Sequence, residues 1–490
     1  MDFLDPKKDF RHKILLFCGY FLISIAILIG TVVLLYESYG YGINQNGQVI
    51  QNGLVYLSST PNPAKIYVNG KYRTTTNTSF TLPSGIYNFS LSLSGYRTWN
   101  RQIEIDGGTI VYFDYPLLIP NQLKTQKVKS YNGAPPIFSQ SPDKQSLLVM
   151  IPNSKYNFDL YDLNNLSQAP VQISLPSNIV SNATSSESWK VISWANDNKH
   201  VLLKHVYDGK TEYILLSTGN PSHSVNLTQT FNTTPFDSIS FVNDNYNQYY
   251  LLNSSTQTLY EVSLSNPSQP KIVLNNVINF DPYLTNTILY ATSKGAPSNE
   301  VFIEEKVGNS YYHIKTLVGG TTYLLNEASY NGIIYVACGA ESQNKVYIYR
   351  DPVSQLNNDP KQMPIPSQVL FVKNPNYLSF SDNAQFIMAE NGSQFGVFDI
   401  ANQHGYNYSS ILPLQGTETH ATWMDGDRIS YVSGNKLVMF EYDHNYAQTL
   451  EAAAPNYSAF FDPNYKYIIN LTQNPKNTNF SITKTSLIAS

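Results

Sequence analysis

From residue 123 onward the chain repeats one loose unit. Each unit consists of an aromatic residue, a short polar turn containing Asp or Asn, an apolar strand, a second turn, and a strand rich in Tyr, Val or Phe. A period of roughly 40 to 50 residues with four short strands is typical of a β-propeller blade, which buries its faces only against neighbouring blades. The sequence therefore predicts a β-propeller over residues 123–490. The units begin at Phe138, Trp194, Phe241, Phe280, Tyr330, Phe380, Trp423 and Phe461.

The number of blades is less firmly indicated than the fold. Eight units predict eight blades, or seven if the weak segment ASYNGIIYVAC at residues 328–338 is an insertion. Residues 123–131 are expected to form a strand that completes the last blade. The units FSQSPDKQSLLVM at Phe138 and FSDNAQFIMAE at Phe380 resemble TolB-like and WD-repeat-like propeller repeats, although other units have lost the Pro or Gly of that motif.

The segment 14–36 contains 23 residues without a charge. As a helix it is long enough to cross the roughly 30 Å hydrocarbon core of a membrane. Lys7, Lys8, Arg11 and Lys13 precede it, and the next basic residue is Lys65. The positive-inside rule therefore predicts a cytoplasmic N-terminus (residues 1–13), an uncleaved signal anchor and an extracytoplasmic remainder. The run lacks the shorter apolar core and small-residue cleavage site of a removable signal peptide.

Beyond the anchor, residues 37–53 are rich in Gly, Asn and Gln and are expected to be a tether. Residues 54–120 then alternate as short strands. Asn69 and Gly70 supply a two-residue hairpin turn, and a second hairpin is expected at residues 106–108. The runs SSTPNPAKIYVNGK and LPSGIYNFSLSLSGYRTW resemble the PEGA domain, a small β-sandwich. The resemblance implies a surface location and a spacer or adhesive role.

No catalytic, cofactor or metal motif is found in the chain. It has no G-x-S-x-G elbow, no P-loop and no dinucleotide fingerprint. His200 and His205 lie five apart on one expected strand, so they face opposite sides and are interpreted as surface residues. The acidic turns at residues 243–247 and 425–428 lack the spacing of an EF-hand calcium loop. Cys18 and Cys338 are too far apart to suggest a disulfide framework, and Cys338 is expected to be a buried strand thiol.

Composition favours a binding surface. Only 13% of residues are charged and the net charge is -4, which gives no basic footprint for nucleic acid. The chain has 38 tyrosines, and tyrosine is enriched at protein interfaces. Three of them, Tyr246, Tyr406 and Tyr408, lie in polar stretches that are expected to be loops, and we predict that they contact a partner.

The leading hypothesis is a membrane-anchored surface protein whose propeller binds a protein or glycan without catalysis or cofactor. Two alternatives remain open. A propeller can assemble an active site from several blades, as in glycosidases and lyases, and clustered carboxylates, Arg or His at the mouth of its central funnel would favour such an enzyme. The propeller could also be a structural subunit of a cell-envelope complex.

Overall fold

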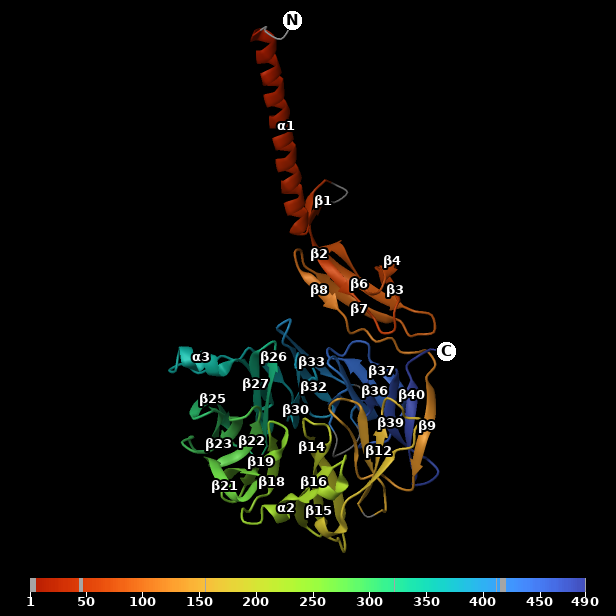
Figure 1. Ribbon diagram of the computed structural model, residues 1–490, viewed down its shortest axis with the longest axis vertical. Helices are drawn as coiled ribbons and strands as arrows, with labels where there is room; N and C mark the ends of the chain where they lie inside the picture. Colours follow the sequence, from red (N-terminus) through yellow and green to blue (C-terminus); the bar gives the residue numbers. More distant parts are fainter. Residues whose placement is uncertain are drawn as a thin grey trace. The chain divides into compact units, whose positions relative to one another are not determined.

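The computed structural model describes residues 6–43, 47–154, 156–320, 322–410, 412–414 and 420–489. Within these ranges the chain forms two compact units, residues 1–122 with 488–490, and residues 123–487. The first consists of one long helix and a set of strands, and the second is built almost wholly of strands (Figure 1).

Helix α1 (Pro6–Ser38) contains the apolar segment. Within its stretch from Phe10 to Ser38, the most apolar 18 residues have a mean hydropathy of 2.5 and no buried side chains, as expected of a membrane span. The hydroxyls of Ser24 and Thr31 donate to the carbonyls of Tyr20 and Ile27, so neither is left without a partner in an apolar environment.

The rest of the first unit is a β-sandwich of two four-stranded sheets. Its core contains Val55, Leu57, Ile66, Leu91 and Trp99, none of which is exposed. One sheet consists of β1 (Tyr41–Ile43), β2 (Val49–Leu57), β5 (Thr78–Pro83) and β8 (Ile110–Phe113). The other consists of β3 (Lys65–Val68), β4 (Lys71–Thr75), β6 (Gly85–Ser92) and β7 (Trp99–Ile105).

Of the two expected hairpins, the first is confirmed and the second is wrong. Asn69 and Gly70 have φ angles of 49° and 76° and join β3 to β4. The turn at residues 106–108 instead carries the chain from one sheet to the other, because β7 pairs with β6 while β8 pairs in parallel with β2. The expected tether at 37–53 is also corrected, since it contains β1 and the first half of β2.

The second unit contains, in the described part of the chain, eight four-stranded antiparallel sheets, numbered here in chain order. All eight leading aromatics of the repeat lie on the first strand of a sheet. First strands of neighbouring sheets, such as β22 with β26, lie side by side.

The strands of the eight sheets follow one another in chain order, except that β9 joins the last sheet. The first four sheets are β10 (Phe138–Gln140), β11 (Ser146–Met150), β12 (Asn157–Asp162), β13 (Val171–Ser174); β14 (Glu187–Trp194), β15 (His200–Tyr207), β16 (Lys210–Ser217), β17 (Val225–Asn226); β18 (Ser238–Val242), β19 (Asn245–Asn253), β20 (Thr258–Ser263), β21 (Asn266–Asn275); and β22 (Val277–Pro282), β23 (Thr287–Thr292), β24 (Glu300–Val307), β25 (Ser310–Val318).

The last four sheets are β26 (Tyr323–Tyr330), β27 (Ile333–Ala340), β28 (Lys345–Arg350), β29 (Gln368–Phe371); β30 (Tyr377–Phe380), β31 (Phe386–Glu390), β32 (Gln394–Asp399), β33 (His404–Ser409); β34 (Thr422–Trp423), β35 (Arg428–Ser433), β36 (Lys436–Glu441), β37 (Gln448–Ala452); and β38 (Phe460–Phe461), β39 (Tyr467–Gln473), β40 (Phe480–Ser486) with β9 (Lys124–Tyr131). Two short helices, α2 (Leu227–Thr230) and α3 (Pro352–Asn358), lie in connections.

Neighbouring sheets share their apolar cores. One cluster joins the first and second sheets through side chains such as Phe158 and Leu203. Another joins the fourth and fifth through Leu289 and Cys338, the latter fully buried as expected. Each sheet therefore depends on its neighbours for the burial of its faces.

The two ends of the propeller meet in the eighth sheet. Strand β9, orange in Figure 1, pairs antiparallel with β40, in blue, over its whole length. Tyr131, at the end of β9, extends its hydroxyl to the neighbouring first sheet, where it lies 2.6 Å from Asp159 Oδ2 and 2.7 Å from the Tyr161 hydroxyl. Lys129 Nζ lies 2.6 Å from the same Asp159 oxygen. Residues 123–131 thus complete the last sheet, as predicted.

Tyr131→Phe tests this closure. The substitution removes the hydroxyl that bridges Asp159 and Tyr161, and Asp159 is fully enclosed. We expect the free energy of unfolding to fall by about 1–3 kcal/mol, because a buried acceptor loses a donor. Chemical denaturation of the full chain in detergent measures the change. The control Tyr311→Phe, on a side chain that is 57% exposed, should shift it by less than about 0.5 kcal/mol; equal shifts would contradict the closing role.

Candidate functional site

A pocket of about 450 Å³ opens between the second and third sheets. Its walls come from the turn before β15, the end of β16, the 3-10 turn Pro221–His223, and the start of β19 and end of β20. Tyr246, one of the three tyrosines predicted to contact a partner, lies in its wall. The lining residues are Lys199, His200, Leu215, Ser217, Gly219, Asn220, His223, Val225, Tyr246 and Leu264.

The Tyr246 ring is held in place by His200. The two rings stack with their centroids 3.8 Å apart and an interplanar angle of 11°. His200 Nδ1 lies 2.6 Å from Asp197 Oδ2, and Asp197 also accepts the backbone N–H groups of Lys199 and His200. Partial burial raises the pKa of Asp197, but these hydrogen bonds outweigh it and leave that pKa below its usual value. The aromatic wall of the pocket is therefore positioned by an ionised carboxylate.

The pocket combines an aromatic and aliphatic wall with polar groups at one side. Leu215, Val225 and Leu264 supply apolar surface, and Ser217, Asn220 and His223 supply hydrogen-bonding groups. An aromatic ring beside amide, hydroxyl and imidazole groups suits a ligand with one apolar face and several hydroxyls. The volume also lies within the range of small-molecule sites.

None of the three tyrosines is a loop residue, so that part of the prediction is wrong: Tyr246 lies on β19, and Tyr406 and Tyr408 lie on a later strand. Both lie on β33, the outer strand of the sixth sheet. Tyr408 donates its hydroxyl to the Tyr442 carbonyl at 3.1 Å and stacks on Phe395 and His444. Tyr406 packs edge-on against the Tyr442 ring. The two therefore join the sixth sheet to the seventh, far in sequence from the pocket that contains Tyr246.

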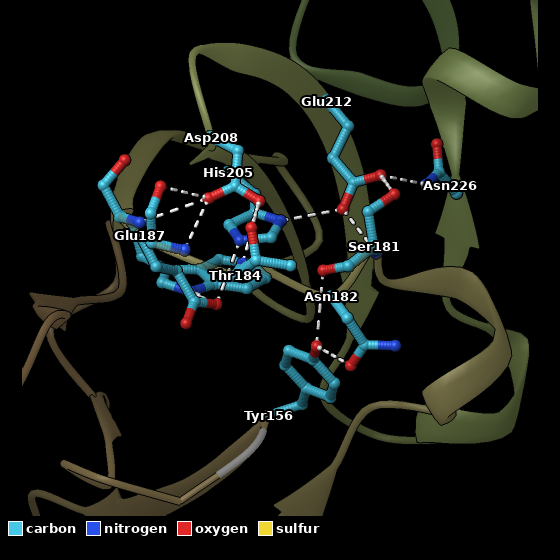
Figure 2. A network of polar contacts seen from close by, with 12 residues as sticks. Tyr156, Ser181, Asn182, Thr184, Glu187, His205, Asp208, Glu212 and Asn226 are labelled. Carbon is cyan, nitrogen blue, oxygen red and sulfur yellow. Dashed lines mark hydrogen bonds and ion pairs between the residues drawn. The ribbon is translucent and has the colours of Figure 1, made fainter.

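His205 is fully buried, and its interpretation as a surface residue is wrong. Figure 2 shows the imidazole between two carboxylates, with Nδ1 2.7 Å from Glu212 Oε1 and Nε2 3.0 Å from Glu187 Oε1. The Trp189 indole stacks on it at 4.0 Å. It faces the first sheet while His200 faces the third, so the predicted opposite orientation of the two histidines is confirmed.

Glu212 is the centre of this network. Its carboxylate also accepts hydrogen bonds from the backbone and hydroxyl of Ser181 and from the Asn226 amide, as Figure 2 shows. Burial raises the pKa of Glu212, but the hydrogen bonds from His205, Ser181 and Asn226 outweigh it and lower that pKa overall. A lowered pKa stabilises the fold above the ordinary carboxyl range and ceases to do so as pH falls through the folded value. The network thus fastens β15 and β16 to the connection that precedes β14.

A second polar cluster lies between the fourth and fifth sheets. Asp281 and Glu305 both pair with Leu289, so all three side chains point to the face that packs on the fifth sheet, where Glu327 lies on β26. Glu305 is 1% exposed and Glu327 7%. Oε2 of Glu305 and both oxygens of Glu327 have no hydrogen-bond partner among the described residues.

These carboxyl groups favour their protonated forms. Burial, with the charges of Glu305 and Asp281, raises the pKa of Glu327, and burial with the charge of Asp351 raises that of Glu305. Burial raises the pKa of Asp281 to about 7, although the Glu327 backbone N–H donates to it. Perturbed carboxyl groups are found at many active sites. Here, however, Glu305 and Glu327 are enclosed between sheets and lie outside the pocket with Tyr246.

The described residues contain no group of three or more His, Cys, Asp or Glu that could hold a metal ion. In the acidic turn at 425–428, Asp425 is paired with Arg428 at 2.6 Å and accepts the backbone N–H groups of Asp427 and Arg428. The Asp425 carboxylate therefore stabilises the turn by accepting hydrogen bonds from its backbone.

Comparison with known families now assigns the first unit. Residues 52–119 match the model of the PEGA domain. The sandwich is a PEGA domain. Its hairpin at Asn69 and Gly70 and its core at Trp99 fall within the matched segment. No curated protein sequence matches the chain.

Solved β-propellers resemble the chain in fold. The propeller domain of Cps50 (Swd1) from Myceliophteria thermophila is 10% identical, with 73% of this chain and 99% of that chain covered and a TM-score of 0.37. An oligogalacturonate lyase in complex with manganese is 12% identical, with 74% and 93% covered and a TM-score of 0.40. An oligogalacturonate lyase from Vibrio parahaemolyticus is 10% identical, with 75% and 94% covered and a TM-score of 0.38. The assignment as a propeller rests on the sheet topology described above.

Glu327→Gln tests the carboxyl cluster. A raised carboxyl pKa means that the folded chain holds protons that the unfolded chain releases, so stability falls as pH rises from about 4.5 through the folded values. The variant cannot ionise at this position. We expect a flatter dependence of the unfolding midpoint between pH 5 and 9, and a gain of about 1–2 kcal/mol at pH 9. Glu341→Gln, at a partly exposed position, is the control; a profile parallel to that of the unchanged protein would refute the argument.

Proposed function

We propose that the protein is anchored by α1 with its N-terminus in the cytoplasm, and that its propeller is a non-catalytic binding platform outside the membrane for a protein or glycan partner. The PEGA domain acts as its spacer on the surface. Lys7, Lys8, Arg11 and Lys13 before the apolar segment, and the absence of basic residues from 14 to 64, support this orientation.

The pocket that contains Tyr246 is the observation that carries the binding role. An aromatic wall fixed by stacking costs little conformational entropy on binding, because the Tyr246 ring is already held by His200 and Asp197. Asn220, Ser217 and His223 supply the polar contacts that hydroxyl groups of a sugar ring require. Within the two partner classes, the pocket therefore favours a glycan.

Among the described residues, the carboxyl cluster is the feature that favours an enzyme. A carboxylic acid kept protonated near neutral pH can act as a general acid, as required for glycoside cleavage. Asp281, Glu305 and Glu327 have this character. The burial of Glu305 and Glu327 argues against contact with a polymer substrate, so the binding role is the better supported. No specific observation on the described residues favours a role as a structural subunit of an envelope complex.

Tyr246→Ala tests the binding role. The full chain in detergent is applied to a glycan array, and the affinity for each bound glycan is compared with that of the variant. We expect at least a tenfold loss of affinity. The unfolding midpoint is measured alongside, because the ring also packs against the core between the second and third sheets. Tyr311→Ala, exposed on the fourth sheet, should bind normally. Retained glycan binding by Tyr246→Ala would exclude the pocket, and binding of the unchanged protein to no glycan of the array would refute the preference for a glycan partner.

The orientation predicts the result of proteolysis on intact cells. Protease added outside a cell with a permeabilised wall should remove the PEGA domain and the propeller and leave a membrane fragment that contains α1. An antibody to residues 1–13 follows that fragment. Full protection of the propeller would contradict the orientation.

A further inference from the structure

The passage from α1 into the PEGA domain is short and closely hydrogen-bonded. The helix ends at Ser38 and β1 begins at Tyr41, so two residues separate them. Gly40 N donates to the Glu37 carbonyl at 3.0 Å, which ends the helix, and the Gly40 carbonyl accepts Asn52 N at 2.7 Å. The last turn of the helix is thus joined directly to β2.

Glycine is required at this junction. Gly40 has a φ of 80°, and a Cβ there would lie 2.8 Å from the Asn52 carbonyl oxygen. A Cβ on Gly42 would meet only the amide end of the Asn52 side chain, at 2.7 Å, which can move aside. Gly40 therefore lets the chain approach β2 closely, and the junction has a defined shape in place of a flexible linker.

Exposed aromatic and aliphatic side chains surround this junction. Tyr36, Tyr39 and Val49 are 54%, 65% and 63% exposed, and Tyr41 is 37% exposed with its ring 5.3 Å from that of Tyr36. Together with Gln51 they line a hollow of about 680 Å³, called here the junction hollow. Apolar side chains exposed in such a group mark a contact surface.

We propose that the junction hollow lies in the headgroup layer of the membrane and takes up lipid there, so that the PEGA domain is seated on the membrane surface. This rests on the proposed anchoring by α1. The helix that enters the hydrocarbon core continues into the hollow without a flexible segment, which fixes the depth of Tyr39 and Tyr41 at the membrane boundary. Tyrosine has the apolar ring and polar hydroxyl that this layer favours.

The chemistry of the hollow also specifies the kind of lipid contact. No Lys or Arg occurs between Lys13 and Lys65, so the hollow offers no cation to an anionic headgroup. Its contacts are apolar insertion and hydrogen bonds from tyrosine and glutamine. The association should therefore be independent of lipid charge and of salt.

Site-directed spin labelling in nanodiscs tests this arrangement. The full chain with Cys18→Ala is labelled at Tyr39→Cys or Val49→Cys, and buried Cys338 does not react. The ratio of oxygen to nickel-chelate accessibility measures depth in phosphatidylcholine. Ser79→Cys is the control, because Ser79 pairs with Tyr56, about 23 Å along β2 from Val49 at 3.3 Å per residue.

We expect a ratio several-fold higher at positions 39 and 49 than at 79, unchanged by phosphatidylglycerol or by added salt. A label at Leu28→Cys, in the centre of the span, reports on the anchor itself. If position 28 is deep while 39 and 49 are as accessible to the nickel chelate as 79, the seating on the membrane is overturned and the anchor stands. If position 28 is also in water, the anchoring proposal fails first.

Discussion

The pairing of β9 with β40 is the contact on which the propeller depends. Every sheet buries its faces against its neighbours, so an open ring would leave two apolar faces and the edge of β40 in water. The closure places a strand from the start of the unit beside one from its end. It then fastens them with Tyr131 and Lys129, which reach Asp159 of the first sheet. A buried carboxylate between two donors gives this contact a defined geometry that apolar packing alone would lack.

The interior of the propeller holds two polar clusters with opposite electrostatics. Around His205, the hydrogen bonds that Glu212 accepts outweigh the effect of its burial, so the pKa of Glu212 is lowered. Around Glu327, oxygens lack donors, and burial raises the carboxyl pKa values. The first cluster stabilises the fold at pH values above the folded pKa of Glu212. The second stabilises the fold at lower pH, where its carboxyl groups are protonated. The stability of the propeller should therefore pass through a maximum between the two ranges.

The sequence predicts features that depend on neighbouring residues far better than those that depend on distant pairing. The eight leading aromatics all lie on the first strand of a sheet, and Asn69 with Gly70 forms its turn, because the signal in each case spans a few residues. The turn at 106–108 has the same local signal, yet β8 pairs with β2, more than fifty residues earlier. Tyr406 and Tyr408 lie in a polar stretch of sequence, but β33 pairs with β32 and packs on the seventh sheet.

The candidate site was predictable only in part for the same reason. The polar residues around Tyr246 indicate an exposed position, whereas its contact with His200, 46 residues earlier, comes from the packing of the second sheet on the third. The burial of His205 follows from carboxylates on two other strands, which no local pattern reveals.

Tyrosine links these separate findings into one physical pattern. With only 13% of its residues charged, the chain has few ion pairs available to orient its parts. A tyrosine ring supplies apolar contact area and its hydroxyl one directional hydrogen bond, so it can fill a core and fix a geometry together. Tyr131 does this at the ring closure and Tyr408 between the sixth and seventh sheets. Where the second partner lies outside the chain, as proposed for Tyr246 and Tyr39, the same two properties become a means of recognition.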